Sequence, residues 1–225
     1  MIRSISVKED SVQSKILFFN YADLSPFTSR VVPLFGPNGV GKSTLISAIE
    51  SRDVDLTYDN KVKIYAYCNS RDNFKVRRAR TMFEDFDPAF IVARMNAQLI
   101  SEGQSLIYSM LDLLDGFMKN GGLKPESGVD NLVLLDEIDS GISIDVIDFV
   151  MHKIKYVVRT RSDVQFIFSF NSPRVLKHFP QVLSMYDGKM IELYTEKDML
   201  KVINEHKKEF NKARKTSRGR PKIPC

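Results

Sequence analysis

The stretch "LFGPNGVGKSTLISAIE", residues 34–50, decides the fold of this chain. It contains the pattern G-x-x-x-x-G-K-[ST], with an apolar strand predicted before it at 30–35 and a helix predicted after it at 42–52. Glycines let such a turn bend so that its N–H groups face an anion, and the helix start adds partial positive charge. We therefore predict a phosphate-binding loop. Its residues are Gly36, Pro37, Asn38, Gly39, Val40, Gly41, Lys42, Ser43 and Thr44.

Two side chains of this loop and two acidic residues predict a nucleotide site. In this pattern the lysine, Lys42, reaches the β and γ phosphates, and the hydroxyl of Ser43 holds Mg²⁺. The apolar stretch "NLVLLDEID" (131–139) predicts a strand with Asp136 at its carboxyl end, where open α/β sheets bind ligands. We expect Asp136 to orient the metal and Glu137 to polarise an attacking water. ATP and Mg²⁺ are the expected substrate and cofactor.

The rest of the chain alternates between strand and helix patterns, which predicts an α/β fold with a mainly parallel sheet. The first two predicted strands are expected to pair, as an antiparallel N-terminal addition. The further predicted strands cover 2–7, 15–22, 61–68, 163–170 and a hairpin at 182–194 that turns at Asp187-Gly188. The further predicted helices cover much of 70–100, then 105–118, 143–160 and a last helix from about 197 that gives way to a tail at 212.

Composition and charge set the domain organisation. Residues 201–225 carry nine Lys/Arg and two Asp/Glu, or +7, so the other 200 residues sum to −2 of the total +5. We predict one ATPase domain at 1–200, with a helical lobe at about 70–120, and a basic helix end with a flexible tail at 201–225. No apolar run of 18 residues occurs and the N-terminus is charged, so a cytoplasmic protein without a transmembrane segment is expected. The two cysteines do not predict a disulfide framework, and the three scattered histidines do not have the spacing of metal ligands.

Four ordered motifs together resemble those of the ABC-type ATPases. "GPNGVGKST" (36–44) looks like Walker A, and "SEGQ" (101–104) looks like the signature S-x-G-Q. "LVLLDEIDSGIS" (132–143) looks like Walker B running into the D-loop, and "FIFSFNSPRVL" (166–176) looks like the switch strand. The order and spacing fit from about residue 15 to about residue 195. The resemblance implies a P-loop NTPase of the ABC-ATPase type with a small helical signature lobe.

The resemblance also implies a partner. In this family the signature residues, here Ser101, Gly103 and Gln104, close over the γ-phosphate held by the other subunit. The helix that follows them points its positive end at the same phosphate. Two ATP molecules would then be enclosed in a head-to-tail homodimer. The ordinary alternative is that "SEGQ" only caps a helix, with nothing bound.

The chain departs from the family pattern at the switch. Asn171 stands where many soluble members have the histidine of His-Ser-Pro. Asparagine can donate a hydrogen bond to the γ-phosphate but cannot carry a proton, so slow hydrolysis is expected. A clear Q-loop glutamine is also missing, and Asn69 is the candidate in its place. Phe19 or Tyr21 is the candidate for stacking on adenine, against the alternative of a core role.

The switch region favours the SMC, RecF and OLD-like group over transporter subunits. There is no heptad run between Walker A and the signature, so a compact head without the long coiled-coil arm of the SMC type is expected. Such heads act in DNA maintenance or phage defence beside a separate effector or nuclease chain. Two alternatives remain: the ATP-binding subunit of a membrane transporter, or a nucleotide-gated regulatory module with negligible turnover. The basic run Arg71–Arg80 predicts either a nucleic-acid or partner contact, or a solvated helix face.

The tail adds a candidate DNA contact. The run Arg218, Gly219, Arg220, Pro221 and Lys222 resembles the core of an AT-hook. An extended Gly-Arg-Pro segment lets both arginines lie along a narrow A·T minor groove, where the negative potential is deepest. The alternative is a disordered basic tail without sequence preference.

Overall fold

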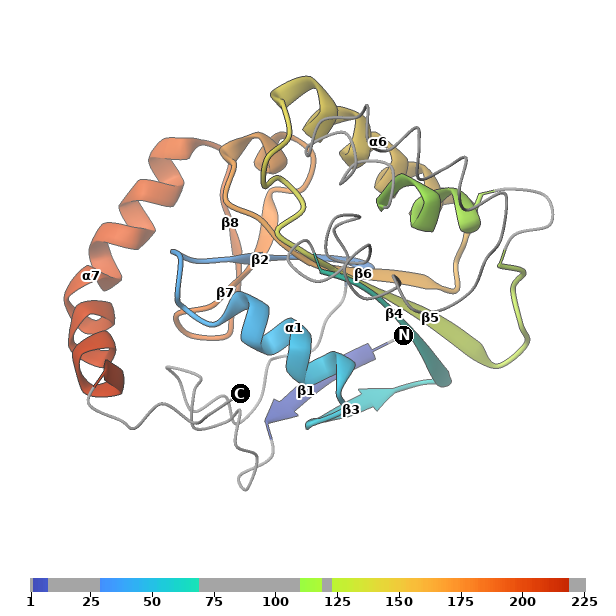
Figure 1. The fold of residues 1–225 in the computed structure, drawn as a ribbon, viewed down its shortest axis with the longest axis horizontal. Helices are drawn as coiled ribbons and strands as arrows, with labels where there is room; N and C mark the ends of the chain where they lie inside the picture. The colour runs from blue at the N-terminus through green and yellow to red at the C-terminus, as the bar shows by residue number, and fades with distance from the viewer. Residues whose placement is uncertain (1, 8–28, 69–109, 119–122, 219–225) are drawn as a thin grey trace, which may run out of the picture.

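A computed structural model describes residues 2–7, 29–68, 110–118 and 123–218 of the chain (Figure 1). The predictions of a strand at 15–22 and of helices within 70–100 lie outside these residues. The strands are β1 (Ile2–Val7), β2 (Val31–Phe35), β3 (Val54–Tyr58), β4 (Lys61–Cys68), β5 (Val129–Asp136), β6 (Val164–Ser169), β7 (Gln181–Ser184) and β8 (Met190–Glu192). The helices are α1 (Lys42–Glu50), α6 (Ile144–Thr160), the 3-10 helix η2 (Pro173–Lys177) and α7 (Glu196–Arg218).

A mainly parallel sheet forms the centre of the molecule. Its strand order is β4-β5-β6-β2-β7-β8, and only β8, paired with β7, runs antiparallel. Every residue of β2, β5 and β6 is buried. Strands covered on both faces have continuous apolar runs of this kind, because neither face meets water. The predicted α/β class and the hairpin at the end of the sheet are confirmed.

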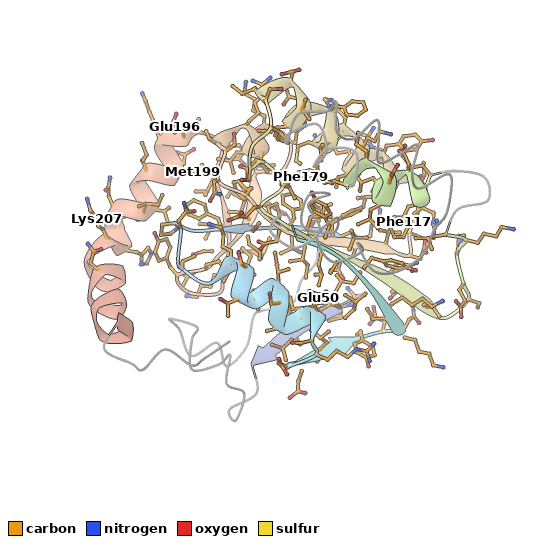
Figure 2. The ribbon with its side chains drawn as sticks, viewed as in Figure 1. Glu50, Phe117, Phe179, Glu196, Met199 and Lys207 are labelled. Carbon is orange, nitrogen blue, oxygen red and sulfur yellow. The ribbon has the colours of Figure 1, made fainter. Side chains whose placement is uncertain are left out.

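Helices cover both faces of this sheet. Figure 1 shows α1 on one face and α6 on the other, and both contact β6. The buried residues of α6 recur at helical spacing, namely Ile147, Val150, Met151, Ile154, Val157 and Val158. Residues 110–116 are helical, as predicted for this part of 105–118. Figure 2 shows Phe117, just after this helix, and Phe179 on the side of the sheet that α6 covers.

The antiparallel addition is present, but the partner of β1 among the described strands is one that the sequence pattern did not identify. β1 pairs with β3. In "VDLTY" of β3 only Val54 is buried, so this strand lacks the apolar run that indicates a strand in sequence. Ile2 and Ile5 are buried, and the backbone N–H of Ile2 donates to Gln165 Oε1 at 2.9 Å. The small sheet is therefore tied to β6 of the large one.

α7 extends further than the sequence predicted. It runs to Arg218, whereas the expected tail began at 212. The stretch 212–218 contains Ala213 and long basic side chains that favour helix, and the strong helix breakers Gly219 and Pro221 follow only afterwards. Met199 is buried against the core, while Glu196 and Lys207 are exposed on the same helix (Figure 2). None of the helices in the described part of the chain is long and apolar enough to cross a membrane.

Candidate functional site

Three neighbouring parallel strands bring the predicted site together. In the order β5-β6-β2, Leu135 lies opposite Phe168 and Ser169 lies opposite Leu34. The residues at the carboxyl ends of these three strands therefore lie at the same edge of the sheet. They are Asp136, the last residue of β5, with Glu137 directly after it, then Asn171 after β6, and the glycine loop after β2. Because these strands are parallel, their carboxyl ends form the crevice where such sheets bind ligands.

The glycine loop has the backbone geometry of a phosphate cradle. Gly39 and Gly41 have φ of 83° and 108°, in the left-handed region that favours glycine. A Cβ atom on Gly36 would lie 2.7 Å from Val40 Cγ1, so only glycine fits there. A pocket of about 180 Å³ opens beside the loop, in front of the α1 N-terminus. It is lined by Asn38, Gly39, Gly41, Lys42, Ser43, Thr44 and Glu137. The strand–loop–helix context predicted for 34–50 is confirmed.

Lys42 is buried in this cradle, and the residue is only 6% exposed. Its Nζ donates to the carbonyl of Gly36 at 2.6 Å and to Asn171 Oδ1 at 3.1 Å. Burial lowers the pKa of Lys42, and the carboxylates of Asp139, Asp136 and Glu137 oppose that shift by favouring the ammonium form. Negative phosphates beside Lys42 would act in the same direction as these carboxylates.

Ser43 and Asp136 form the candidate metal site. Ser43 Oγ donates to Asp136 Oδ1 at 3.0 Å, and the same carboxylate oxygen accepts from Ser169 Oγ at 2.5 Å. These are hard oxygen donors, which Mg²⁺ prefers, and Mg²⁺ usually takes only one or two protein ligands beside substrate phosphates. Across the described residues, no group of three or more His, Cys, Asp and Glu side chains could hold a metal. The pair therefore fits Mg²⁺ held together with a nucleotide.

Glu137 stands on a sharp turn directly after Asp136. Its φ of 52° is left-handed, which costs a non-glycine residue roughly 1–2 kcal/mol. The backbone N–H of Glu137 donates to Ser169 Oγ at 2.6 Å, which holds this turn in place. The side chain lines the pocket beside the loop. A carboxylate in this position can reach a water molecule in the pocket.

Asn171 lies at the site, in contact with Lys42. Sequence comparison with the switch motif predicted this position, and the structure brings it beside the loop lysine. Ser172 caps η2, because its Oγ accepts the N–H of Arg174 at 3.3 Å. Arg174 and His178 both contact Asp148 of α6, which fixes η2 against that helix and lowers the pKa of Asp148. The switch segment is thus anchored on both sides of Asn171.

Two further polar residues at the site were missed by the sequence analysis. Ser169 is fully buried and contacts both Asp136 and Glu137. Asp139 accepts hydrogen bonds from the backbone of Asn171 and Ser172. The signal for Asp139 was present in "LVLLDEID", because a third acid after the strand end lies on the same turn. A serine at the end of an apolar strand, by contrast, gives no distinctive pattern.

Several predicted site residues lie outside the described part of the chain. They are Ser101, Gly103, Gln104, Asn69, Phe19, Tyr21, the run Arg71–Arg80, and Gly219, Arg220, Pro221 and Lys222. Arg218 is the last residue of α7, so it is helical and not extended as an AT-hook requires. The predicted lobe at 70–120 is described only at 110–118.

Comparisons with known proteins give structural neighbours and no sequence relatives. No protein-family model matches the chain, and no curated protein matches it in sequence. cbiO1 from Clostridium perfringens, part of the ABC transporter complex cbiONQ, has 15% identity and a TM-score of 0.46 over 93% of this chain and 97% of its own. The ADP conformation of MJ1267, an ATP-binding cassette of an ABC transporter, has 16% identity and a TM-score of 0.43 over 92% and 96%.

A neighbour of another kind is C. elegans PCH-2, with 17% identity and a TM-score of 0.36 over 77% of this chain and 37% of its own. Identities below 20% and TM-scores below 0.5 are too low to transfer the role of any residue to this chain.

Proposed function

We propose that this chain is an ATPase of the ABC type, which binds ATP with Mg²⁺ and hydrolyses it. The observation that supports this most directly is the meeting of Lys42, Ser43 and Asp136 at the edge of the sheet. A buried lysine, a left-handed glycine loop and a helix start favour phosphate. The oxygen pair of Ser43 and Asp136 favours Mg²⁺.

The residues of the chain have separate parts in this proposal. Lys42 would exchange its contacts with Gly36 and Asn171 for phosphate oxygens. Ser43 and Asp136 would hold Mg²⁺, which would neutralise charge on the phosphates. Glu137 accepts a proton from the attacking water. The amide of Asn171 donates to the γ-phosphate. No imidazole stands at this position, which supports slow turnover.

The proposed assembly is a head-to-tail homodimer around two ATP molecules. The motif resemblance supports it, because Ser101, Gly103 and Gln104 match the signature that acts across such a dimer. The described α1 N-terminus and loop form an open pocket, which a second subunit could cover. This assembly would couple ATP binding to dimerisation.

The proposed role is in DNA maintenance or phage defence, with a separate effector or nuclease chain. The His-Ser-Pro-like switch and the basic tail support it. Two other functions are carried by the same motifs. One is the ATP-binding subunit of a membrane transporter, and the other is a nucleotide-gated module with negligible turnover.

A turnover assay distinguishes these functions. Phosphate release is measured with ATP and Mg²⁺, with and without duplex DNA. Turnover that DNA stimulates supports the proposed role. Turnover that is the same with and without DNA, together with co-purification of a membrane protein, favours the transporter subunit. Tight ATP binding without turnover under any condition favours the regulatory module.

Asn171 gives a prediction about rate. Asn171→His is expected to raise kcat about tenfold, because an imidazole can both donate to phosphate and carry a proton. Asn171→Ala is expected to lower kcat about tenfold, through the loss of one hydrogen bond to a charged group. ATP affinity should change little in both variants, as measured by titration with a fluorescent ATP analogue. Equal turnover in all three proteins would contradict the switch assignment.

The tail gives a prediction about DNA. Deleting 213–225 removes Arg214, Lys215, Arg218, Arg220 and Lys222, and duplex binding should become weaker and less dependent on salt. The fold should remain, because Met199, which is buried in the core, lies upstream of the deletion.

The double variant Arg218→Lys with Arg220→Lys keeps the charge but removes the planar guanidinium groups. We expect it to weaken binding to A·T-rich duplex by about tenfold and to G·C-rich duplex by much less, measured by fluorescence anisotropy. If both duplexes bind equally before and after the change, the tail is a basic extension without sequence preference and not an AT-hook. Arg218 is helical, and an AT-hook requires it to leave α7. The double variant therefore tests the AT-hook more directly than the deletion does.

A further inference from the structure

Asp139 joins two separate parts of the site, the turn after Asp136 and the segment at Asn171 and Ser172. It lies on the turn that follows Asp136, which is closed by a hydrogen bond from Ser140 N–H to the Glu137 carbonyl at 3.1 Å. One carboxylate oxygen, Oδ2, accepts the N–H of Asn171 at 2.7 Å and also the N–H of Ser172. These contacts link segments 32 and 33 residues apart in sequence.

The two N–H groups that Asp139 accepts lie just beyond the end of β6. They come after the last paired residue of the strand and before η2, so neither the sheet nor the 3-10 helix provides a carbonyl for them. Successive N–H groups that converge on one anion form a nest. The carboxylate therefore determines how the backbone of Asn171 leaves the sheet, and the backbone in turn directs the side chain of Asn171 to Lys42.

The other carboxylate oxygen of Asp139, Oδ1, is buried and has no hydrogen-bond partner among the described residues. Leaving a charged oxygen unsatisfied costs free energy, so a packing role alone does not explain an acid here.

We propose that Asp139 is a positioning residue for the switch: it holds Asn171 against Lys42, so that the Asn171 amide faces the γ-phosphate when ATP binds. This inference rests on the proposed ATPase function. The turn at Glu137–Ser140 is then coupled to the switch, because the contacts of Asp139 would move Asn171 together with that turn.

A double-mutant cycle tests the inference. Asp139→Ala is expected to lower kcat about tenfold in the wild-type background, since it removes hydrogen bonds to a charged acceptor. In the Asn171→Ala background the same change is expected to cost less than about threefold, because nothing is left to position. Asp139→Asn keeps an oxygen that accepts both N–H groups, and it should retain most of the rate. Glu126→Ala is the matched control, since it removes an exposed acid that pairs only with Lys63 among the described contacts.

A second measurement needs no nucleotide. Amide hydrogen exchange at Asn171 and Ser172, followed by NMR, should become faster in Asp139→Ala and stay unchanged in Glu126→Ala. Unchanged exchange, equal rate losses in both backgrounds, or an Asp139→Asn variant as slow as Asp139→Ala would overturn the positioning role. In a further outcome, the wild-type protein neither binds nor hydrolyses ATP while Asp139→Ala still exchanges its amides faster. That result would overturn the ATPase proposal and support the contact between Asp139 and the backbone of Asn171 and Ser172.

Discussion

Glu137→Gln is expected to lower kcat for ATP hydrolysis by about 10²–10⁴-fold, the usual contribution of a positioned general base. Glutamine keeps the size of the side chain but cannot accept the proton of the attacking water. The cradle around Lys42, Ser43 and Asp136 is untouched, so ATP affinity should remain within about threefold of the wild-type value. Phosphate release in single-turnover conditions measures the first quantity, and titration with a fluorescent ATP analogue measures the second.

The same variant should accumulate as an ATP-bound dimer. With ATP and Mg²⁺, light scattering should give about twice the monomer mass. Adding Ser101→Arg should return the protein to monomer, because a bulky side chain would block closure over the γ-phosphate of the partner. An oligomer that forms without ATP and is unchanged by Ser101→Arg would contradict a dimer that encloses two ATP molecules.

Lys42→Ala is expected to weaken ATP binding by about 100-fold, which corresponds to the loss of a charged hydrogen bond worth about 3 kcal/mol. The effect should be large because Lys42 is buried, and because the carboxylates of Asp139, Asp136 and Glu137 lie close enough to interact with its charge. With alanine these carboxylates would face the phosphates without the lysine cation between them. Isothermal titration calorimetry with ATP and Mg²⁺ measures the change.

Lys63→Ala is the matched control for Lys42→Ala. Lys63 forms an exposed ion pair with Glu126 at the amino end of the β4–β5 pair, away from the loop. Exposed pairs contribute little, so ATP affinity should not change. A melting curve of each variant checks that it is folded. Wild-type affinity in a folded Lys42→Ala protein would refute the nucleotide site.

Local patterns were sufficient to predict the parts of the site that lie within one segment. The motif at 34–50 predicted the left-handed loop and the helix start, since only glycine adopts those conformations without strain. The apolar run before Asp136 predicted a buried strand with an acid at its end, and β5 ends at Asp136. Motif order placed Asn171 beside this site, and it contacts Lys42.

The pairing of distant segments was decided only by the tertiary structure. The sequence alone determined the phosphate loop, the alternation of strands and helices, and the acids at the end of β5. It did not determine that β3 pairs with β1, that Ser169 holds Asp136, or that Asp139 holds the backbone of Asn171. The reason is physical: periodicity reports which face of one segment is buried, whereas these contacts depend on the order and register in which strands from distant parts of the chain pack together.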